Sequence, residues 1–401
     1  QHWPLAELTV KTSELVDVQI LDEELCPRYC GIIVKSVSVA PSPDWLVRRI
    51  EAMGLKPINN VVDITNYVLF ATAQPIHAFD LAKIAGPRIV IRRAKKGESI
   101  RTLEGKDAVL SAEMLVIADE KRPVAIAGVI GGEESAVSAT TQDVFIESAC
   151  FDPVSVRKTG KALGLQTDAC YRFERGADVS FAPKAALMAA SLLTQFGGKV
   201  TKDIVDVYPR PRKNKEIILR SRRAADLLGV DVGEEFIEKI LVLLGFTLKP
   251  NQKGTWQVQV PFWRVDIERE ADLVEEIARF YGYDKIPIAV PPLEVLEPVP
   301  SNKEKIRKLC QQLFHRGFDE VINLSFADPD HEAVIASGKT AVEIRNPISS
   351  KASRLRTTML GGLLENTARN KKKERVATQF RGIIVRTKPC CSRVILTGAW
   401  D

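Results

Sequence analysis

Polar side chains interrupt a mostly apolar stretch at residues 59–80, which reads NNVVDITNYVLFATAQPIHAFD. Thr65 and Asn66 lie in its first half, and His77, one of only four histidines in the chain, lies in its second half. Burying a polar group costs free energy unless that group is hydrogen-bonded. The stretch is therefore either a polar part of a core or one wall of a pocket.

Small and polar residues recur at three later places in the chain. The glycine-rich run 128–132 lets the backbone approach a ligand closely, and it lacks the Gly-Lys-Ser/Thr sequence of a P-loop. Glu147 is a carboxylate inside the apolar run 144–150, and Thr167 opens the stretch TDACYRFERG. Each feature taken singly has an ordinary structural explanation. Together they indicate a polar pocket, and the residues alone leave its function open.

Four carboxylates gather near a second place: Asp266, Asp272, Glu275 and Glu276. The apolar spacing predicts a helix over 270–281, on which Asp272 is three and four residues before the two glutamates and therefore faces them. Hard oxygen ligands of this kind suit magnesium. The alternative is that acids in a first helical turn meet the helix dipole and stay solvated. From chemistry alone the solvated alternative is favoured.

The helices and strands expected around these residues indicate an α+β chain with several domains. Residues 1–30 are expected to be the remnant of an N-terminal structural domain, with strands. Residues 31–210 form an α+β module, with a strand at 144–150 and helices at 153–163 and 182–196. Its end is a Pro- and charge-rich link.

Two further modules follow. Residues 211–287 contain two or three helices and a small sheet, which favours a winged-helix-like domain. Residues 288–401 begin with an amphipathic helix and continue with strands at 321–326 and 341–345 and a helix at 361–370. We interpret this third module as an incomplete antiparallel-sheet domain.

Composition fits an ordinary globular protein, with 45% hydrophobic and 27% charged residues. The formal net charge of +6 is compatible with a nucleic-acid partner without demonstrating one. Seven irregularly spaced cysteines favour a reducing compartment over a disulfide framework, and Cys26 and Cys30 are expected to be buried apolar residues rather than metal ligands. No apolar run has the length of a membrane helix, and no signal segment is evident.

Five motifs in this order and spacing closely resemble the editing module of the beta subunits of bacterial phenylalanyl-tRNA synthetases: NNVVDITNYV, QPIHAFD, AIAGVIGGE, FIESACFDP and GLQTDACYRFERG. The resemblance covers residues 28–200. PFWRVDIEREADLVEEIARFYGYDKIP in the second module resembles the same family. So do NLSF, RNPISS and LRTTMLGGLLENTARN in the third, a class II synthetase-like, non-catalytic scaffold. By this resemblance, the chain is expected to be a family member truncated at both ends.

The resemblance implies an editing reaction, the hydrolysis of tyrosine wrongly attached to tRNA(Phe). Tyrosine exceeds phenylalanine by one hydroxyl, which an apolar pocket rejects only weakly, so a second, hydrolytic sieve is needed. By motif match Glu147 accepts the phenol as an ionised carboxylate. Gly131 and Ala169 shape the slot, Asn66 binds substrate, and Thr65, His77 and Thr167 line the ester end as the catalytic set. No nucleophilic serine or cysteine arrangement is evident, so water is expected to attack directly.

The resemblance also implies partners and cofactors. The family binds magnesium through the four acids at 266, 272, 275 and 276, which raises the metal interpretation above the solvated one. Two alpha and two beta subunits are expected to assemble in the cytoplasm, to bind tRNA(Phe) and to use ATP. By the resemblance, the synthetic site is expected in the alpha subunit and the third module is expected to have lost that activity. Residues 302–401 offer no convincing set of phosphate-binding arginines; Arg354 and Arg356 come nearest.

Two other functions remain open at this point. The chain is alternatively a non-catalytic tRNA-binding, nucleic-acid-binding or scaffold protein that kept the fold, or a free-standing editing hydrolase. Hydrolysis of mischarged tRNA separates the scaffold from the two enzymes, and assembly with the alpha subunit separates the enzymes from each other.

Overall fold

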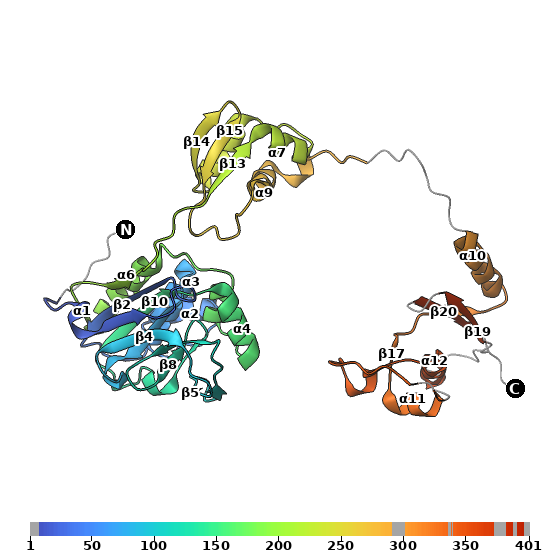
Figure 1. The fold of residues 1–401 in the computed structure, drawn as a ribbon, viewed down its shortest axis with the longest axis horizontal. Helices are drawn as coiled ribbons and strands as arrows, with labels where there is room; N and C mark the ends of the chain where they lie inside the picture. Colours follow the sequence, from blue (N-terminus) through green and yellow to red (C-terminus); the bar gives the residue numbers. More distant parts are fainter. Residues whose placement is uncertain are drawn as a thin grey trace. The chain divides into compact units, whose positions relative to one another are not determined.

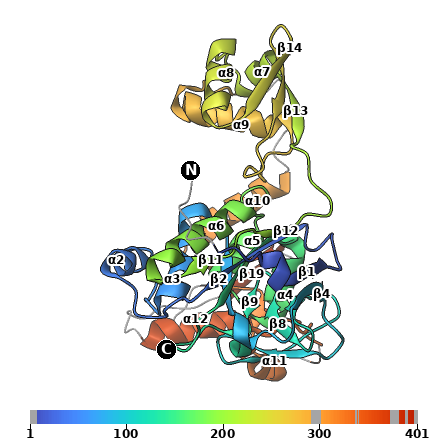
Figure 2. The same ribbon diagram turned by 90° about the vertical axis from the view of Figure 1, so that its left-hand side faces the viewer.

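The computed structural model describes residues 8–290, 301–335, 338, 340–372, 382–387 and 391–396. It divides into two compact units, residues 1–289 and 290–401, which are described separately. Both mix helices with sheets, and all strand pairs given for the described residues are antiparallel except one (Figures 1 and 2). None of the described helices is both long and apolar enough to cross a membrane.

A five-stranded antiparallel sheet forms the centre of the first unit. Its path is β11 (Lys199–Val200), β2 (Arg28–Lys35), β10 (Val144–Cys150) and β3 (Ile76–Asp80), and β12 (Val205–Val207) also pairs with β2. One face is covered by α2 (Asp44–Ala52), α3 (Asn60–Thr72) and α6 (Ala182–Leu193). Helix α6 lies close to the sheet because its inner side chains are small: Ala185, Ala186, Ala189 and Ala190 are all fully buried.

A second sheet packs against the opposite face of the first. Its order is β1 (Asp17–Ile20), β4 (Arg88–Arg93), β7 (Leu115–Ala118), β8 (Pro123–Ile126) and β9 (Ile130–Gly131), while β5 (Ser99–Arg101) pairs with β6 (Asp107–Val109). Phe79 and Phe145 of the first sheet share one apolar core with Ile89 and Ile117 of the second. Side chains alternate along a strand, so Glu147, two residues after Phe145, faces this same side.

Local signals explain where the helices begin. The Asn59 side chain accepts hydrogen bonds from the backbone N–H groups of Val61 and Val62 and so begins α3. Asp152 caps α4 (Pro153–Leu163) through Ser155 N–H. The short α5 (Asp168–Phe173) follows, with single turns at η1 (Leu81–Lys83), η2 (Glu133–Ser135) and η3 (Thr194–Phe196).

The segment before residue 31 is built into these two sheets. Strand β1 pairs in parallel with β4, and Cys26 and Tyr29 are fully buried in the shared core. The boundary expected after residue 30 therefore falls inside β2. The strands predicted for this segment are correct for β1, whereas Thr12–Leu15 forms a helical turn, α1. Cys26 and Cys30 are buried, as predicted.

Residues 213–286 form a small module with its own core. The sheet order is β13 (Glu216–Arg220), β15 (Thr255–Gln259) and β14 (Thr247–Gln252), and the helices are α7 (Ser221–Leu228), α8 (Glu234–Leu243), α9 (Glu270–Tyr281) and the turn η4 (Tyr283–Lys285). Leu219, Leu241, Trp256 and Leu273 meet in its core. The helix predicted at 270–281 has the observed bounds.

The second unit contains the helices α10 (Ser301–Phe314) and α12 (Leu360–Lys372) and several shorter elements. The shorter elements are β16 (Asp319–Val321), β17 (Phe326–Ala327), α11 (Pro329–Ile335), η5 (Ser350–Ala352), β18 (Arg354–Leu355), β19 (Gly382–Thr387) and β20 (Cys391–Leu396). The strand predicted at 321–326 is wrong, because β16 ends at its first residue and β17 begins at its last. The strand predicted at 341–345 is also wrong: Glu343 alone forms a bridge, with Arg354, so no ladder develops.

Candidate functional site

A cavity of about 70 Å³ lies between the two sheets of the first unit. Strands β7 and β8 supply an apolar wall, the loop from Gly128 to Gly131 closes one side, and α5 contributes Ala169 and Phe173. The first sheet supplies two polar side chains, His77 and Glu147. The cavity is therefore apolar on most sides and carries titratable groups on one.

Glu147 is placed by the middle strand of the first sheet. Its backbone pairs with His77 on β3 and with Gly31 on β2. The side chain is 6% exposed, and its buried Oε2 has no hydrogen-bond partner in the part of the chain that the structure describes. Burial raises the pKa of this carboxyl to about 8. The carboxyl is therefore mostly protonated at pH 7, whereas the sequence-based expectation was an ionised carboxylate.

His77 is the cross-strand neighbour of Glu147. Directly opposed side chains of an antiparallel pair start about 5 Å apart, so the two side chains lie on the same face. The imidazole packs edge-on against Phe79, with ring centroids 4.4 Å apart. Its Nε2 is buried and has no partner among the described residues. Burial lowers the pKa of His77 to about 4, so the ring is neutral at pH 7.

Gly131 keeps open the space beside that imidazole. A Cβ atom on Gly131 would lie 2.5 Å from His77 Cε1 and 2.7 Å from Nε2, closer than packing permits. The same Cβ would lie 3.0 Å from Cδ1 of Leu103, which also borders the glycine. Glycine at 128 is explained by its backbone conformation as well as by crowding. Its φ is +71°, which favours glycine, and a side chain there would press on Phe151.

Thr167 fastens α5 to the glycine-rich loop. Its hydroxyl donates to the carbonyl oxygen of Val129 over 2.6 Å and accepts from Cys170 N–H over 3.0 Å, which makes it the N-cap of α5. Thr65 on α3 is similarly engaged, because its hydroxyl donates to the Val62 carbonyl oxygen over 2.7 Å. The Thr167 hydroxyl therefore stabilises the start of α5, whereas the Thr65 hydroxyl is bound within α3.

The structure thus brings together only some of the predicted site residues. His77, Gly131, Glu147 and Ala169 line one cavity, whereas Thr65, Asn66 and Thr167 lie outside its lining. The sequence did not single out Ile117, Ala125 and Ile126, which form the apolar wall. They read as ordinary core residues, and only the packing of the two sheets brings them to the site. Nor did it single out Tyr29 and Gln74, whose side-chain oxygens are also buried without a partner among the described residues.

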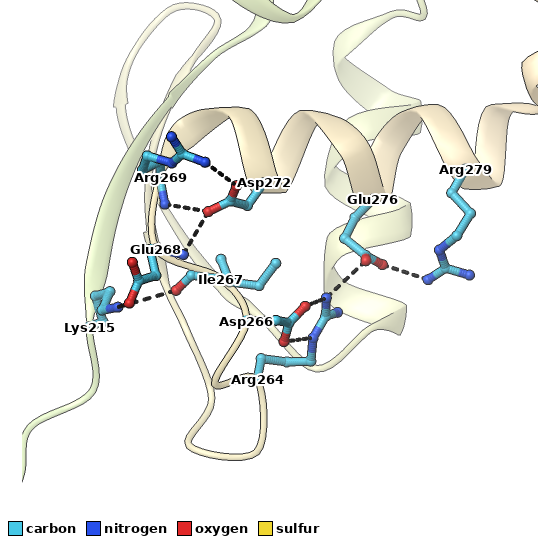
Figure 3. A network of polar contacts seen from close by, with 9 residues as sticks. All are labelled: Lys215, Arg264, Asp266, Ile267, Glu268, Arg269, Asp272, Glu276 and Arg279. Carbon is cyan, nitrogen blue, oxygen red and sulfur yellow. Dashed lines mark hydrogen bonds and ion pairs between the residues drawn. The ribbon is translucent and has the colours of Figure 1, made fainter. Parts of the chain in front are cut away.

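Three of the four carboxylates predicted to bind magnesium, Asp266, Asp272 and Glu276, have other partners in the structure (Figure 3). Arg264 binds Asp266 through Nε and Nη2 at 2.9 and 2.5 Å, and the same Nη2 donates to Glu276 Oε1 over 2.8 Å. Arg279 donates to the other oxygen of Glu276 over 2.5 Å. The paired guanidinium of Arg264 holds the pKa of Asp266 below its usual value.

The other two acids do not join this group. Asp272 Oδ2 accepts from the backbone N–H groups of Glu268 and Arg269 and so begins α9 (Figure 3), while Glu275 is exposed on the same helix. In the part of the chain that the structure describes, no three His, Cys, Asp or Glu side chains are grouped so as to hold a metal ion. The four acids in this arrangement do not fit the predicted magnesium site, because arginine and backbone donors bind Asp266, Asp272 and Glu276 and because Glu275 is exposed on the helix.

Arg354 and Arg356, the nearest candidates for phosphate binding, are also engaged within their module. Arg354 donates to Glu343 over 2.9 Å. Arg356 Nη1 lies within hydrogen-bond distance of the carbonyl oxygens of Asn323 and Leu324, at 3.3 and 3.2 Å. Both guanidinium groups therefore connect segments of this module to one another.

Three consecutive segments of the chain match known families. Residues 25–198 match the B3/4 domain, residues 217–283 match the tRNA synthetase B5 domain, and residues 286–380 match the phenylalanyl tRNA synthetase beta chain CLM domain. The first matched segment contains the cavity, and the second contains the Arg264 ion pairs.

Two curated relatives of this chain have the same name. The phenylalanine--tRNA ligase beta subunit of Geobacter metallireducens is 42% identical over 371 residues, which is 91% of this chain and 46% of the relative. That of Carboxydothermus hydrogenoformans is 41% identical over 368 residues, 90% of this chain and 46% of the relative. The chain thus spans about half the length of the curated relatives it matches.

A solved structure gives a weaker likeness. The crystal structure of an N-terminal fragment of the phenylalanyl-tRNA synthetase beta subunit from Pyrococcus horikoshii is 17% identical, with a TM-score of 0.33, over 70% of this chain and 78% of that one. That score is too low to establish a shared overall fold. The three consecutive domain matches and the curated relatives carry the assignment, and by them this chain belongs to the family of phenylalanyl-tRNA synthetase beta subunits.

Proposed function

We propose that this chain, as part of an aminoacyl-tRNA ligase beta subunit, hydrolyses tyrosine from mischarged tRNA(Phe) in the cavity between its two sheets. One observation carries the proposal: among the described residues, His77 Nε2 and Glu147 Oε2 are buried without hydrogen-bond partners at an otherwise apolar cavity. Unsatisfied buried polar atoms are rare in proteins and call for an explanation. A ligand with a matching polar group supplies one.

The phenol of tyrosine matches the carboxyl of Glu147. A protonated carboxyl can both donate to a hydroxyl and accept from one. Tyrosine would satisfy Oε2, whereas phenylalanine would leave it unpaired at a cost of about 1–3 kcal/mol. That difference corresponds to roughly a tenfold to hundredfold preference for tyrosine. The apolar wall and Ala169 would hold the ring.

The cavity must widen before it holds an aromatic ring. Its volume of about 70 Å³ is below the roughly 150 Å³ of a cavity that binds benzene. Leu103 does not line the cavity but borders Gly131 and is 48% exposed, so its side chain can move without disturbing the core. We therefore expect Leu103 to turn outward when substrate enters.

The residues expected near the ester have less specific roles than Glu147 has at the phenol. A neutral imidazole at His77 can accept a hydrogen bond from the attacking water or orient the terminal ribose. Thr65, Asn66 and Thr167 stay predicted site residues. Thr65 and Asn66 belong to α3, and Thr167 begins α5. Water is expected to attack the ester directly, without a covalent enzyme intermediate.

The wider proposal concerns the assembly. Together with an alpha subunit, in an arrangement of two alpha and two beta chains, this protein would bind tRNA(Phe) and support the ATP-dependent attachment of phenylalanine in the cytoplasm. Magnesium would serve the synthetic reaction in the alpha subunit. We assign no step of that reaction to the carboxylates of this chain.

Deacylation assays on the chain assembled with its alpha subunit test the editing proposal. The substrates are Tyr-tRNA(Phe) and Phe-tRNA(Phe), and the variants are Glu147→Ala and Glu147→Gln. We expect alanine to slow tyrosine release at least tenfold and to remove the preference for tyrosine, and glutamine, which also donates and accepts, to retain much of both. Normal rates in Glu147→Ala would refute the role of Glu147. If the wild type hydrolyses neither ester, the scaffold function is correct instead.

A further inference from the structure

Arg264 contacts two of the acids of the second module. Its guanidinium binds Asp266 through two nitrogens and reaches Glu276 through one of them (Figure 3). Asp266 precedes α9 and Glu276 lies on it, so one cation joins the preceding loop to the helix. These two acids are half of the set predicted to bind magnesium.

The guanidinium is held in place from more than one side. The Arg264 side chain is 17% exposed, compared with 79% for Arg269 on the same segment. Its Cζ lies 5.6 Å from the centre of the Phe246 ring, which covers the planar group. The fork of an arginine matches a carboxylate at two points, so little conformational freedom is lost when each bond forms.

The charges of the cluster balance without a metal. Asp266 and Glu276 face Arg264, and Glu276 also faces Arg279. A magnesium ion gives up its water reluctantly and would have to displace the guanidinium from both carboxylates. The displaced arginine would then lie beside a divalent cation in a largely buried position, and an unpaired charge of this kind is costly.

We propose that Arg264 is the resident counter-cation of Asp266 and Glu276 and occupies the place that a divalent ion would take between them. This module therefore folds and holds α9 to the preceding loop without a metal. A divalent ion binds these carboxylates only when the guanidinium has left. The inference does not depend on the editing proposal, because it concerns a different module and involves no catalytic step.

Metal binding by the full chain tests the proposal, with Mn²⁺ as the probe, followed by electron paramagnetic resonance, and Mg²⁺ in thermal unfolding. Wild type should show no Mn²⁺ binding that depends on Asp266, and its unfolding temperature should be the same in EDTA and in Mg²⁺. Arg264→Gln should unfold at a lower temperature in EDTA, regain part of the loss in Mg²⁺, and bind Mn²⁺ at least tenfold more tightly than wild type.

Two controls separate this proposal from a general loss of positive charge. Arg269→Gln removes an exposed arginine of the same segment and should leave Mn²⁺ binding unchanged. Arg279→Gln removes a partner of Glu276 alone and should increase Mn²⁺ binding less than Arg264→Gln does. Equal gains in all three variants, or no gain in a folded Arg264→Gln, would overturn the proposal. If Arg264→Gln does not fold, Asp266→Asn provides the test instead. A Mn²⁺ signal that is present in wild type and lost in Asp266→Asn would also overturn the proposal.

Discussion

Glu147 and His77 are paired across neighbouring strands, and burial moves their pKa values in opposite directions, to about 8 and about 4. The acid is therefore uncharged below about pH 8 and the base is uncharged above about pH 4. Between these values the cavity carries two neutral groups, each with a free polar atom. A neutral site suits a neutral phenol better than it suits a charged side chain.

The raised pKa of Glu147 predicts that the protein loses stability as the pH rises through neutrality. The folded state keeps a proton that the unfolded state releases, so the free energy of unfolding falls from the unfolded pKa up to the folded pKa of about 8. His77 has the opposite effect below its usual pKa of 6.5 and offsets much of this fall there. Between pH 6.5 and 8 we therefore expect a fall of roughly 1–2 kcal/mol.

Denaturant unfolding at several pH values measures this dependence. Glu147→Gln cannot titrate and should remove the fall above pH 6.5, while His77→Gln should retain it. The assignment fails if Glu147→Gln shows the same fall as wild type.

Gly131 predicts a purely steric effect on the site. Its φ is not in the left-handed region, so a substitution there meets crowding by His77 and Leu103 rather than backbone strain. Gly131→Ala should push the imidazole aside and reduce hydrolysis of Tyr-tRNA(Phe), and Gly131→Trp should block it. Deacylation rates check this, with Ala52→Trp, which adds the same bulk at an exposed position on α2, as the control. Unchanged editing in Gly131→Trp would remove Gly131 from the pocket.

At the scale of elements, the sequence predicts well which face of a helix or strand is buried. It predicts less well which helices and strands lie next to one another. The helix at 153–163 and the strand at 144–150 have the predicted bounds, because their caps and apolar spacing are local signals. The pairing of β3 with β10 joins residues about 70 positions apart, and no local period encodes it. The family resemblance, rather than periodicity, placed Glu147 and His77 in one site.

Thr167 shows how an element can matter to a site that its own side chain does not line. Thr167→Val loses both hydrogen bonds of the hydroxyl, and a lost N-cap costs about 1 kcal/mol. Because α5 is short and carries Ala169 and Phe173 into the cavity, we also expect slower deacylation. Thr167→Ser keeps the hydroxyl and should retain stability and activity. Thermal unfolding and deacylation measure both effects, and equal damage from serine and valine would contradict this role.

At the scale of the whole molecule, the second unit exposes large apolar side chains. Ile348 is 93% exposed, Ile322 86% and Leu324 75%. A contiguous apolar patch usually marks a surface that another chain covers, and Ile322 and Leu324, two residues apart in the chain, are candidates for such a patch. The sequence predicted a scaffold module here from family motifs, but its weak periodicity led to the two wrong strands. Elements with few tertiary contacts leave little pattern to detect.

The expected partner for this surface is the alpha subunit. Mixing the two chains should give a complex whose mass, measured by light scattering after size exclusion, exceeds that of either chain. Ile322→Glu with Leu324→Glu should weaken the complex, whereas Val109→Glu, also at an exposed position but in the first unit, should not. A mixture in which both chains keep their separate masses would favour a free-standing hydrolase.

The parallel pairing of β1 with β4 determines where a recombinant fragment of this protein can begin. A recombinant fragment that starts at residue 31, the boundary suggested by the sequence, loses β1 and the first residues of β2. Strand β4 then has an unpaired edge, and an open strand edge invites other chains to add to it. We expect that fragment to precipitate on expression, and one that starts at residue 8 to remain in solution, as centrifugation of the lysates would show. The shortest usable fragment that contains the cavity therefore begins before residue 31, the boundary that the sequence suggests.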